Sequence, residues 1–330
     1  MSGRILVSET SGPEEPEVSV EAFARALEGE DIETLRPLLP VGYRAGVDAY
    51  RAAASRLDAD TLSSHYTAGL SWFHDSFVPT LVRRVEGLVD GAWDLSKHRA
   101  YAAGSDVDLI AHVVNAATLR GSVNVFPGDW WGFVSGALSP SAVRFAPNAS
   151  AACLAAACVP SVRNGHTTDH MIAFLASAPL RLLNVNLLPT MRRDERVELA
   201  RRLSPLLERS LVSISFSRGF GLTASQLGVL LAPPETVRSL GLERPLEWTT
   251  FFYNRIAAEA FLEIDLDSLA SVDDARRAHV ARWLDERELP SITTGSYYVK
   301  AFRVVGELPA RLVPLARDGL ARVCLKPPIS

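Results

Sequence analysis

The stretch from Ser213 to Gly228 carries the side chains with the clearest chemical meaning in this sequence. It reads Ser-Ile-Ser-Phe-Ser-Arg-Gly-Phe-Gly-Leu-Thr-Ala-Ser-Gln-Leu-Gly, with Arg218 near its middle and Gln226 eight residues later. The guanidinium of Arg218 stays protonated in proteins because its charge is delocalised, so it cannot attack a carbonyl as a neutral amine does. Gln226 can donate a hydrogen bond to a phosphate, but it lacks the charge that makes arginine the stronger partner. This stretch therefore offers a fixed cation in place of a nucleophile.

The same stretch resembles the cofactor-anchoring turn of the class I/II aminotransferases, which belong to the fold-type I family of pyridoxal phosphate (PLP) enzymes. That family keeps a lysine, which holds PLP as a Schiff base, where this sequence has Arg218, and an arginine, which grips the phosphate, where it has Gln226. The resemblance implies a PLP site that has lost both groups, so no covalently bound cofactor is expected. Loss of a charge-assisted hydrogen bond costs roughly 1.5–3 kcal/mol, which also disfavours PLP or pyridoxamine phosphate held non-covalently.

Two further segments match the resembling family in their order along the chain. Gly104-Ser105-Asp106 precedes an apolar helical run, and in the family this turn presents backbone N–H groups and a hydroxyl to the PLP phosphate. An ordinary helix N-cap is the alternative role for Ser105. Trp130 and Trp131 follow where the family has an aromatic residue stacked on the cofactor ring. Either Trp could cover a flat ligand, and packing in the core is the alternative.

Four more polar residues occupy positions that the resemblance connects with the cofactor or the substrate. The family places an acid below the pyridine nitrogen, and the corresponding run here holds Asn184 and Asn186, which carry no negative charge. Asn164 stands near the family's asparagine for the phenolic oxygen of the cofactor, although the proline of that motif is missing. Arg322 matches the family's arginine for the substrate carboxylate, which a planar guanidinium binds through two hydrogen bonds. A surface position is the alternative for Arg322.

A transition-metal site is an alternative interpretation of the segment between Cys153 and His170. Cys153 and Cys158 precede His166 and His170, and the four-residue spacing of the histidines would place both imidazoles on one face of a helix. The cysteines lie in an alanine-rich apolar run that indicates a buried helix, and their distance in sequence from the histidines is shorter than in zinc fingers. We therefore predict no metal site, with His166 and His170 as weak candidates.

Composition excludes several classes of protein. The chain has 330 residues, 48% hydrophobic content and a net charge of −4, which suits a large core and gives no electrostatic footprint for nucleic acid. No apolar run is long enough for a transmembrane helix, so no membrane partner is expected. Three cysteines, an odd number, argue for a reducing, cytoplasmic compartment. Lysine is rare and occurs only at Lys97, Lys300 and Lys326.

The hydrophobic pattern predicts an α/β fold with a mostly parallel sheet. Strand-like runs alternate with helical segments, at 123–126, 143–146, 171–175, 180–186, 211–216 and 229–231. Helices are expected at 20–38, 47–57, 77–89, 248–262 and 271–287, and strands near the C-terminus at 296–305 and 320–325. We expect residues 1–70 to form an N-terminal arm and part of a small domain, 71–245 a large aminotransferase-like domain, and 246–330 the C-terminal small domain.

Together these features predict an atypical enzyme with the fold-type I aminotransferase fold that works without covalent PLP. It would act on an amino-acid-like or carboxylate-bearing small molecule in specialised metabolism, as the homodimer that the resemblance implies. Two alternatives stay open, because a fold does not fix a function. One is a non-catalytic pseudo-aminotransferase subunit that pairs with an active partner. The other is a transaminase that uses PLP or pyridoxamine phosphate non-covalently.

Overall fold

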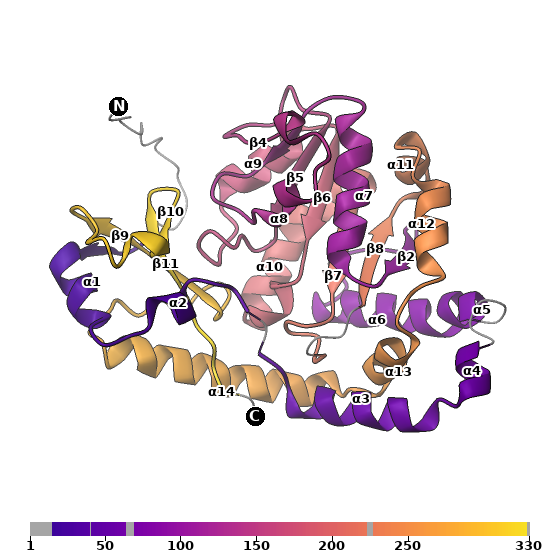
Figure 1. The fold of residues 1–330 in the computed structure, drawn as a ribbon, viewed down its shortest axis with the longest axis horizontal. Coiled ribbons are helices and arrows are strands. Elements are labelled where there is room, and N and C mark those ends of the chain that lie inside the picture. Colours follow the sequence, from indigo (N-terminus) through magenta and orange to yellow (C-terminus); the bar gives the residue numbers. More distant parts are fainter. Residues whose placement is uncertain (1–14, 40, 64–68, 223–226, 329–330) are drawn as a thin grey trace.

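The computed structural model describes residues 15–39, 41–63, 69–222 and 227–328, which form two β-sheets covered by helices (Figure 1). The strands of the larger sheet are β2 (Arg99–Ala103), β3 (Val123–Val125), β4 (Val143–Phe145), β5 (Leu154–Cys158), β6 (Leu180–Asn184), β7 (Ser210–Ser215) and β8 (Gly228–Ala232). Those of the smaller sheet are β1 (Glu17–Ser19), β9 (Val299–Val305), β10 (Ala316–Arg317) and β11 (Leu320–Cys324).

The larger sheet confirms the expected α/β fold with a mostly parallel sheet. Its strand order is β2-β8-β7-β6-β5-β3-β4, in which the strands from β7 to β4 run parallel and β8 and β2 pair antiparallel. The smaller sheet has the order β1-β9-β11-β10, so it joins a strand near the N-terminus to strands near the C-terminus. Parallel sheets are covered on both faces, which explains why every residue of β5, β7 and β8 is buried.

Helices cover both sheets and connect them. In chain order the α-helices are α1 (Val20–Ala26), α2 (Ile32–Leu35), α3 (Arg44–Arg56), α4 (Ala59–Ser63), α5 (Leu70–Trp72), α6 (Val78–Leu88), α7 (Asp106–Thr118), α8 (Gly132–Ser135), α9 (Asp169–Ser177), α10 (Arg193–Leu203), α11 (Pro234–Ser239), α12 (Glu243–Thr250), α13 (Arg255–Glu263) and α14 (Leu266–Asp285). The described residues also form a π-helical turn, η2 (Phe73–Phe77), and 3₁₀ turns at η3 (Pro140–Ala142), η4 (Leu188–Thr190), η5 (Ser204–Arg209) and η6 (Val313–Leu315).

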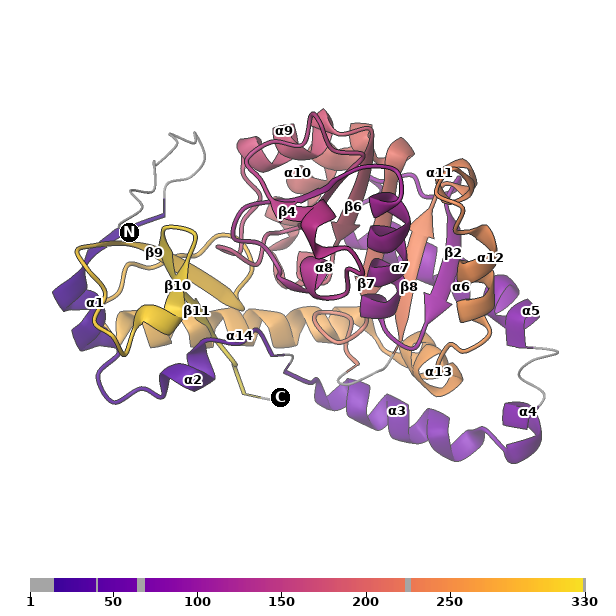
Figure 2. The same cartoon turned by 45° about the horizontal axis from the view of Figure 1, so that its top comes forward.

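The long helix α14 ties the two sheets together. It runs along the underside of the molecule from α13, near the larger sheet, to the smaller sheet (Figure 2). In the same view α3 lies below α13, so the N-terminal helices pack on the elements that follow the larger sheet. No helix within the described ranges is long and apolar enough to cross a lipid bilayer.

Side-chain caps explain several helix starts. Ser19 caps α1, because its Oγ accepts a hydrogen bond from the Ala22 N–H at 3.2 Å. Ser105 Oγ accepts from the Asp108 N–H at the start of α7, and Thr168 Oγ1 accepts from the Met171 N–H at the start of α9. The cap at Ser105 fixes the start of α7, which borders the site described below.

Several predicted elements are wrong in type or extent. The expected strand at 171–175 is part of α9, and the expected helix around Cys153–Cys158 is strand β5. Both are short, continuously apolar runs, which periodicity alone does not assign to helix or strand. The expected helix at 20–38 is two helices, since Gly29 has a φ of +79° and ends the first. The expected helix at 248–262 is also two, because Asn254 caps a new helix, α13.

Candidate functional site

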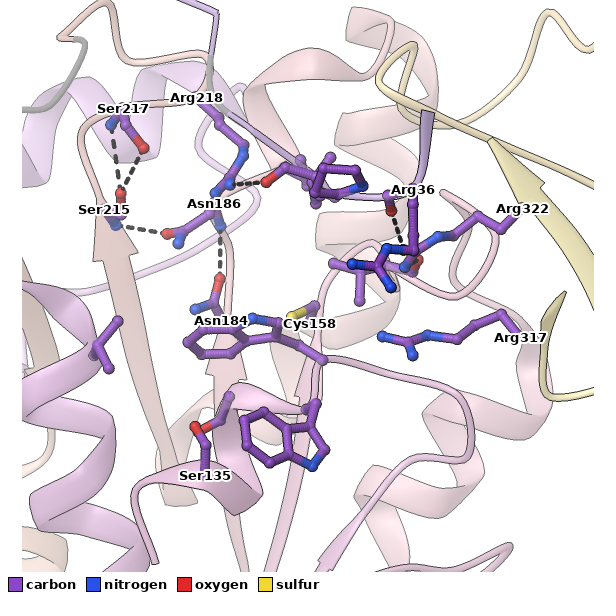
Figure 3. A pocket seen from close by; sticks show the side chains of 18 of the residues that line it. Arg36, Ser135, Cys158, Asn184, Asn186, Ser215, Ser217, Arg218, Arg317 and Arg322 are labelled. Atoms are coloured by element: carbon purple, nitrogen blue, oxygen red, sulfur yellow. Dashed lines mark hydrogen bonds between the residues drawn. The ribbon is translucent and has the colours of Figure 1, made fainter. Parts of the chain in front are cut away.

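A cavity of about 660 Å³ lies at the carboxyl ends of the parallel strands. Cys158 is the last residue of β5, Asn184 of β6 and Ser215 of β7, and all three line the cavity. Open parallel sheets bind ligands at this edge, because neighbouring strands deliver their last residues to one place. Arg317 and Arg322 reach into the cavity from the side of the smaller sheet (Figure 3). The site is therefore built where the two sheets face each other.

The carboxylate of Asp106 is buried in the first turn of α7, between two amides. Its Oδ2 accepts hydrogen bonds from Asn186 Nδ2 at 2.8 Å and from Asn184 Nδ2 at 3.2 Å. The Oδ1 of Asn186 in turn accepts from the Ser215 N–H at 2.6 Å. Burial raises the pKa of Asp106, while the Asn186 amide and the charge of Arg218 oppose that shift. An acid thus already occupies the helix N-terminus, where partial positive charge favours an anion.

Arg218 lies in the turn that follows β7, and its side chain enters the cavity wall. Its Nη2 donates a hydrogen bond to the backbone oxygen of Leu38 at 2.6 Å. Its Nε is buried and has no hydrogen-bond partner in the described part of the chain. Burial lowers the pKa of the guanidinium, and the neighbouring Tyr298 and Asp106 oppose that shift. A guanidinium pKa starts so high that the group remains charged at neutral pH.

Residues 36–39 and 41–42, here called the strap, form one wall of the cavity. Arg36, Pro37 and Leu38 line it directly. Four buried or half-buried side chains donate hydrogen bonds to backbone oxygens of the strap: Arg322 to Arg36 at 2.8 Å, Arg218 to Leu38 at 2.6 Å, Tyr298 to Val41 at 3.2 Å, and Arg276 to Gly42. The strap is thus fastened through its backbone by side chains from residues 218–322, far from it in the sequence.

The cavity brings together five of the predicted site residues: Arg218, Arg322, Asp106, Trp130 and Trp131. The Trp130 ring is half-buried and packs edge-on against Phe133, with 5.4 Å between ring centroids. The Trp131 side chain is 60% exposed at the cavity rim, so it is free to cover a ligand. Arg322 is buried, and its Nη1 donates to the Val162 backbone oxygen at 3.0 Å.

Two other predicted residues do not line the cavity. Ser105 uses its hydroxyl as the N-cap of α7, where it also donates to Asp108 Oδ2 at 2.9 Å. Asn164 is buried in a neighbouring turn, where its Nδ2 donates to Glu15 Oε1 at 2.7 Å and its Oδ1 accepts from the His166 N–H at 3.1 Å. Gln226 lies outside the described residues.

His166 and His170 do not share a helix face, so the geometry expected for a metal-binding pair is wrong. Helix α9 begins at Asp169, which leaves His166 in the preceding turn. His170 Nε2 lies 3.0 Å from the Pro147 backbone oxygen. Burial lowers the pKa of His166 to about 4, with the charge of Lys300 acting in the same direction. No group of three or more His, Cys, Asp or Glu side chains that could hold a metal occurs among the described residues.

Several residues of the cavity were not predicted as site residues. Arg36, Arg317, Cys158 and Ser215 come from different elements, and no sequence motif joins them. Asn184 and Asn186 were considered only as missing acids, although their place at the end of a predicted parallel strand is a signal for a ligand-binding edge. Because the run that ends at Cys158 was predicted as a helix, the position of Cys158 at the end of a parallel strand was not recognised.

None of the three lysines lines this cavity. Lys97 and Lys326 are exposed, whereas Lys300 is buried in β9 and donates from Nζ to the Thr294 backbone oxygen at 3.0 Å. Burial lowers the pKa of Lys300 to about 8, and Glu195 opposes that shift. The cavity therefore presents guanidinium groups and no primary amine from the described side chains.

Comparison of the sequence with family models gives no match, and comparison with curated proteins gives none either. Solved structures are similar across nearly the whole chain. A probable N-succinyldiaminopimelate aminotransferase from Thermus thermophilus has a TM-score of 0.64 at 17% identity, with 92% of this chain and 93% of that chain covered. An Escherichia coli protein with a methionine aminotransferase function has a TM-score of 0.62 at 16% identity, with 97% and 95% covered.

The aspartate aminotransferase of Thermotoga maritima is similar as well, with a TM-score of 0.61 at 13% identity over 92% of this chain and 90% of that chain. At such identities the likeness concerns the path of the backbone and carries no activity with it. The seven-stranded, mostly parallel sheet and the cavity at its carboxyl edge agree with this likeness. The chain therefore has the fold-type I fold of the class I aminotransferases.

Proposed function

We propose that this chain is an enzyme with the aminotransferase fold that has lost covalent PLP chemistry and acts on an amino-acid-like or carboxylate-bearing small molecule. The observation that carries the proposal is the guanidinium of Arg218 in the wall of the cavity, at the position where the resembling family has its lysine. A protonated guanidinium has no electron pair free for attack on an aldehyde. The Schiff base of the family therefore has no counterpart at this position.

The other residues at the family's cofactor positions do not suit PLP either. Asn184 and Asn186 belong to the run that corresponds, by the resemblance, to the acid below the pyridine nitrogen, and both Nδ2 groups donate to Asp106. A neutral amide does not stabilise a protonated pyridine ring as a carboxylate does. The carboxylate of Asp106 itself lies at the helix N-terminus where the family binds the phosphate, and two like charges there repel. The residues at these positions therefore do not fit PLP.

The arginine side chains of the cavity provide positively charged hydrogen-bond donors for a carboxylate. A guanidinium has five N–H groups, and Arg322 uses two of its nitrogens toward Val162 and Arg36, which leaves hydrogen atoms for a ligand. We assign the ligand's carboxylate to Arg322 and place Trp131 as a cover over a planar part of it. Arg218 acts as a fixed cation that stabilises negative charge developing on the bound molecule. A homodimer is part of the proposal, and gel filtration with light scattering tests it.

The Arg218→Lys variant tests whether restoring a primary amine at this position is enough to restore PLP binding. We expect neither the wild-type protein nor this variant to retain PLP through gel filtration, because Asp106 and Asn184 remain in the variant. Absorbance in the visible range and intact mass after borohydride reduction measure the outcome. An aminotransferase that has its lysine, treated identically, is the positive control. A borohydride-trapped adduct in the wild-type protein, on Lys97 or Lys300 for example, would refute the loss of covalent chemistry.

A transamination assay tests the alternative that the protein is a transaminase that uses PLP or pyridoxamine phosphate non-covalently. Pyridoxamine phosphate and a 2-oxo acid, added to the wild-type protein, should yield no amino acid above the rate without protein. Formation of amino acid at a rate that depends on the protein would contradict the proposal, and it would favour non-covalent use of the cofactor.

A further inference from the structure

A second cavity, of about 210 Å³, lies between α2, the second half of α14 and the chain that leaves β11. These elements meet beside the smaller sheet (Figure 1). None of the residues that line it lines the first cavity, at the carboxyl edge of the larger sheet. An apolar cavity of about 150 Å³ can hold a benzene molecule, so this one has room for a ring with a small substituent.

One wall of the second cavity is an aromatic ring that is held in place. Trp283, on α14, is half-buried, and the guanidinium carbon of Arg287 lies 4.3 Å from the centre of its ring. Arg287 donates from Nη1 to the Trp283 backbone oxygen at 3.2 Å and forms an ion pair with Glu30. The buried side chains of Leu35 and Pro327 add apolar surface. These walls suit a flat apolar ring, because aromatic rings pack well on one another.

Two polar side chains of the second cavity lack a partner among the described residues. The ammonium of Lys326 is exposed, and the imidazole of His279 is half-buried. Neither takes part in a hydrogen bond or an ion pair within the described ranges. Glu33, which precedes Thr34 of the cavity wall, is already paired with Arg36 at 3.2 Å. An ammonium group can only donate hydrogen bonds and an imidazole N–H donates too, so both side chains can serve the oxygens of an anion.

The buried wall of the second cavity lies in a positive electrostatic potential. Cys324, the last residue of β11, is buried in this wall. Burial raises the pKa of its thiol, and the positive charges of Arg322, Arg317 and Lys326 oppose that shift because they favour the thiolate. A potential that favours a thiolate also favours a carboxylate bound at the same place.

We infer that the second cavity binds a small aromatic carboxylate, with its ring against Trp283 and its carboxylate hydrogen-bonded to Lys326 and His279. A carboxylate has two oxygens, so it can accept from both side chains. Lys326 is exposed, which lets a ligand enter from solvent. This inference does not depend on the proposed function, because the two cavities share no lining residue.

Benzoate is the probe that tests this site, with benzyl alcohol as an uncharged ring of similar size and acetate as a carboxylate without a ring. The indole N–H resonances of the six tryptophans, in nitrogen-15 correlation spectra of the full chain, report where each probe binds. Trp283→Phe assigns the resonance of the second cavity, and Trp130→Phe and Trp131→Phe assign those of the first. We expect the Trp283 resonance to titrate at a benzoate concentration about fivefold or more below that of either control compound.

A charge-removing variant tests the role of the lysine. Lys326→Gln should weaken the benzoate titration of the Trp283 resonance by about fivefold and leave the benzyl alcohol titration unchanged. Lys97→Gln is the matched control, because Lys97 is also exposed and lines neither cavity. It should change neither titration. Unchanged positions of the other indole resonances show that both variants are folded.

The outcomes separate the two cavities. If benzoate leaves the Trp283 resonance in place, whether or not those of Trp130 and Trp131 move, the second site is refuted. Equal titrations of the Trp283 resonance by benzoate and benzyl alcohol, or a benzoate titration that Lys326→Gln leaves unchanged, would overturn the assignment of a carboxylate. A shift of Trp283 alone, with the first cavity unaffected by any carboxylate, supports this site and counts against the proposed function.

Discussion

Replacing Asp273 with alanine should lower the free energy of unfolding by about 3–5 kcal/mol. Asp273 lies on α14, where its Oδ1 accepts hydrogen bonds from the hydroxyls of Tyr43 at 2.7 Å and Tyr297 at 2.6 Å. All three side chains are buried, and so is Arg276, whose guanidinium lies 4.0 Å from the centre of the Tyr43 ring. Alanine would remove the acceptor that the two hydroxyls share, which leaves them only each other at 3.3 Å, and would leave a buried cation without its nearby acid. Removing one partner of such a cluster costs more than the cluster contributed.

The adjacent residue provides a matched control. Asp274 is on the same helix, but its side chain is 76% exposed and lies 3.3 Å from Arg277 Nη2 in a solvent-facing ion pair. Asp274→Ala should change stability by less than about 1 kcal/mol, because such pairs contribute little. Urea denaturation followed by circular dichroism compares the two variants. A stability of Asp273→Ala within about 1 kcal/mol of Asp274→Ala would show that the cluster does not hold α14 to the segments of Tyr43 and Tyr297.

Replacing Gly228 with alanine should destabilise the protein by roughly 3 kcal/mol or more and weaken binding in the cavity. A Cβ at this position would lie 2.0 Å from the Asp106 backbone nitrogen and 2.3 Å from the Ser105 carbonyl carbon. Both atoms are backbone, so the first turn of α7 would have to move away from β8. Gly228 also pairs with Ala103 in β2 and with Ser215 in β7, which holds the strand in place on both sides. Asp106 would be displaced as a result.

Gly87 serves as the control for this substitution. It lies in α6, and an added Cβ would meet nothing within 4 Å. Gly87→Ala should be neutral or stabilise the protein by up to about 1 kcal/mol, since alanine favours helix. Thermal and urea unfolding measure stability. Calorimetry with glutarate, a small dicarboxylate, measures binding affinity in the cavity. Wild-type stability in Gly228→Ala would mean that α7 and β8 are less closely packed than described.

The sequence supports the fold better than it supports individual elements. The strands β6, β7 and β8 and the helices α6, α7 and α14 lie close to where the hydrophobic pattern predicts them. The errors at β5 and α9 share one cause, since both contain short, continuously apolar runs. In β5 the burial of every residue removes the alternation that marks a half-exposed strand, and its alanines favour helix in isolation. Only the tertiary environment decides such segments.

The candidate site divides in a similar way. Arg218 and Asp106 were found because motif-like stretches surround them, and both line the cavity. Arg36 and Arg317 were not found, because no local pattern marks them: Arg36 follows α2, Arg317 ends β10, and only the fold brings both to the cavity. Asn164 was selected on a weak motif, and its amide serves a neighbouring turn instead. Residues that only the fold brings together show no characteristic spacing in the sequence.

The strap affects the affinity of the cavity for a ligand. Arg218 and Arg322 fasten residues 36–39 with N–H groups of the kind an anion seeks. A segment of the chain thus competes with the incoming molecule for the same cations. An anion that binds these N–H groups weakens their hydrogen bonds to the strap. By thermodynamic linkage, a change that weakens those hydrogen bonds makes the N–H groups more available to the anion. Affinity for an anion is therefore adjustable through substitutions that change the backbone path of residues 36–39 and leave Arg218 and Arg322 in place.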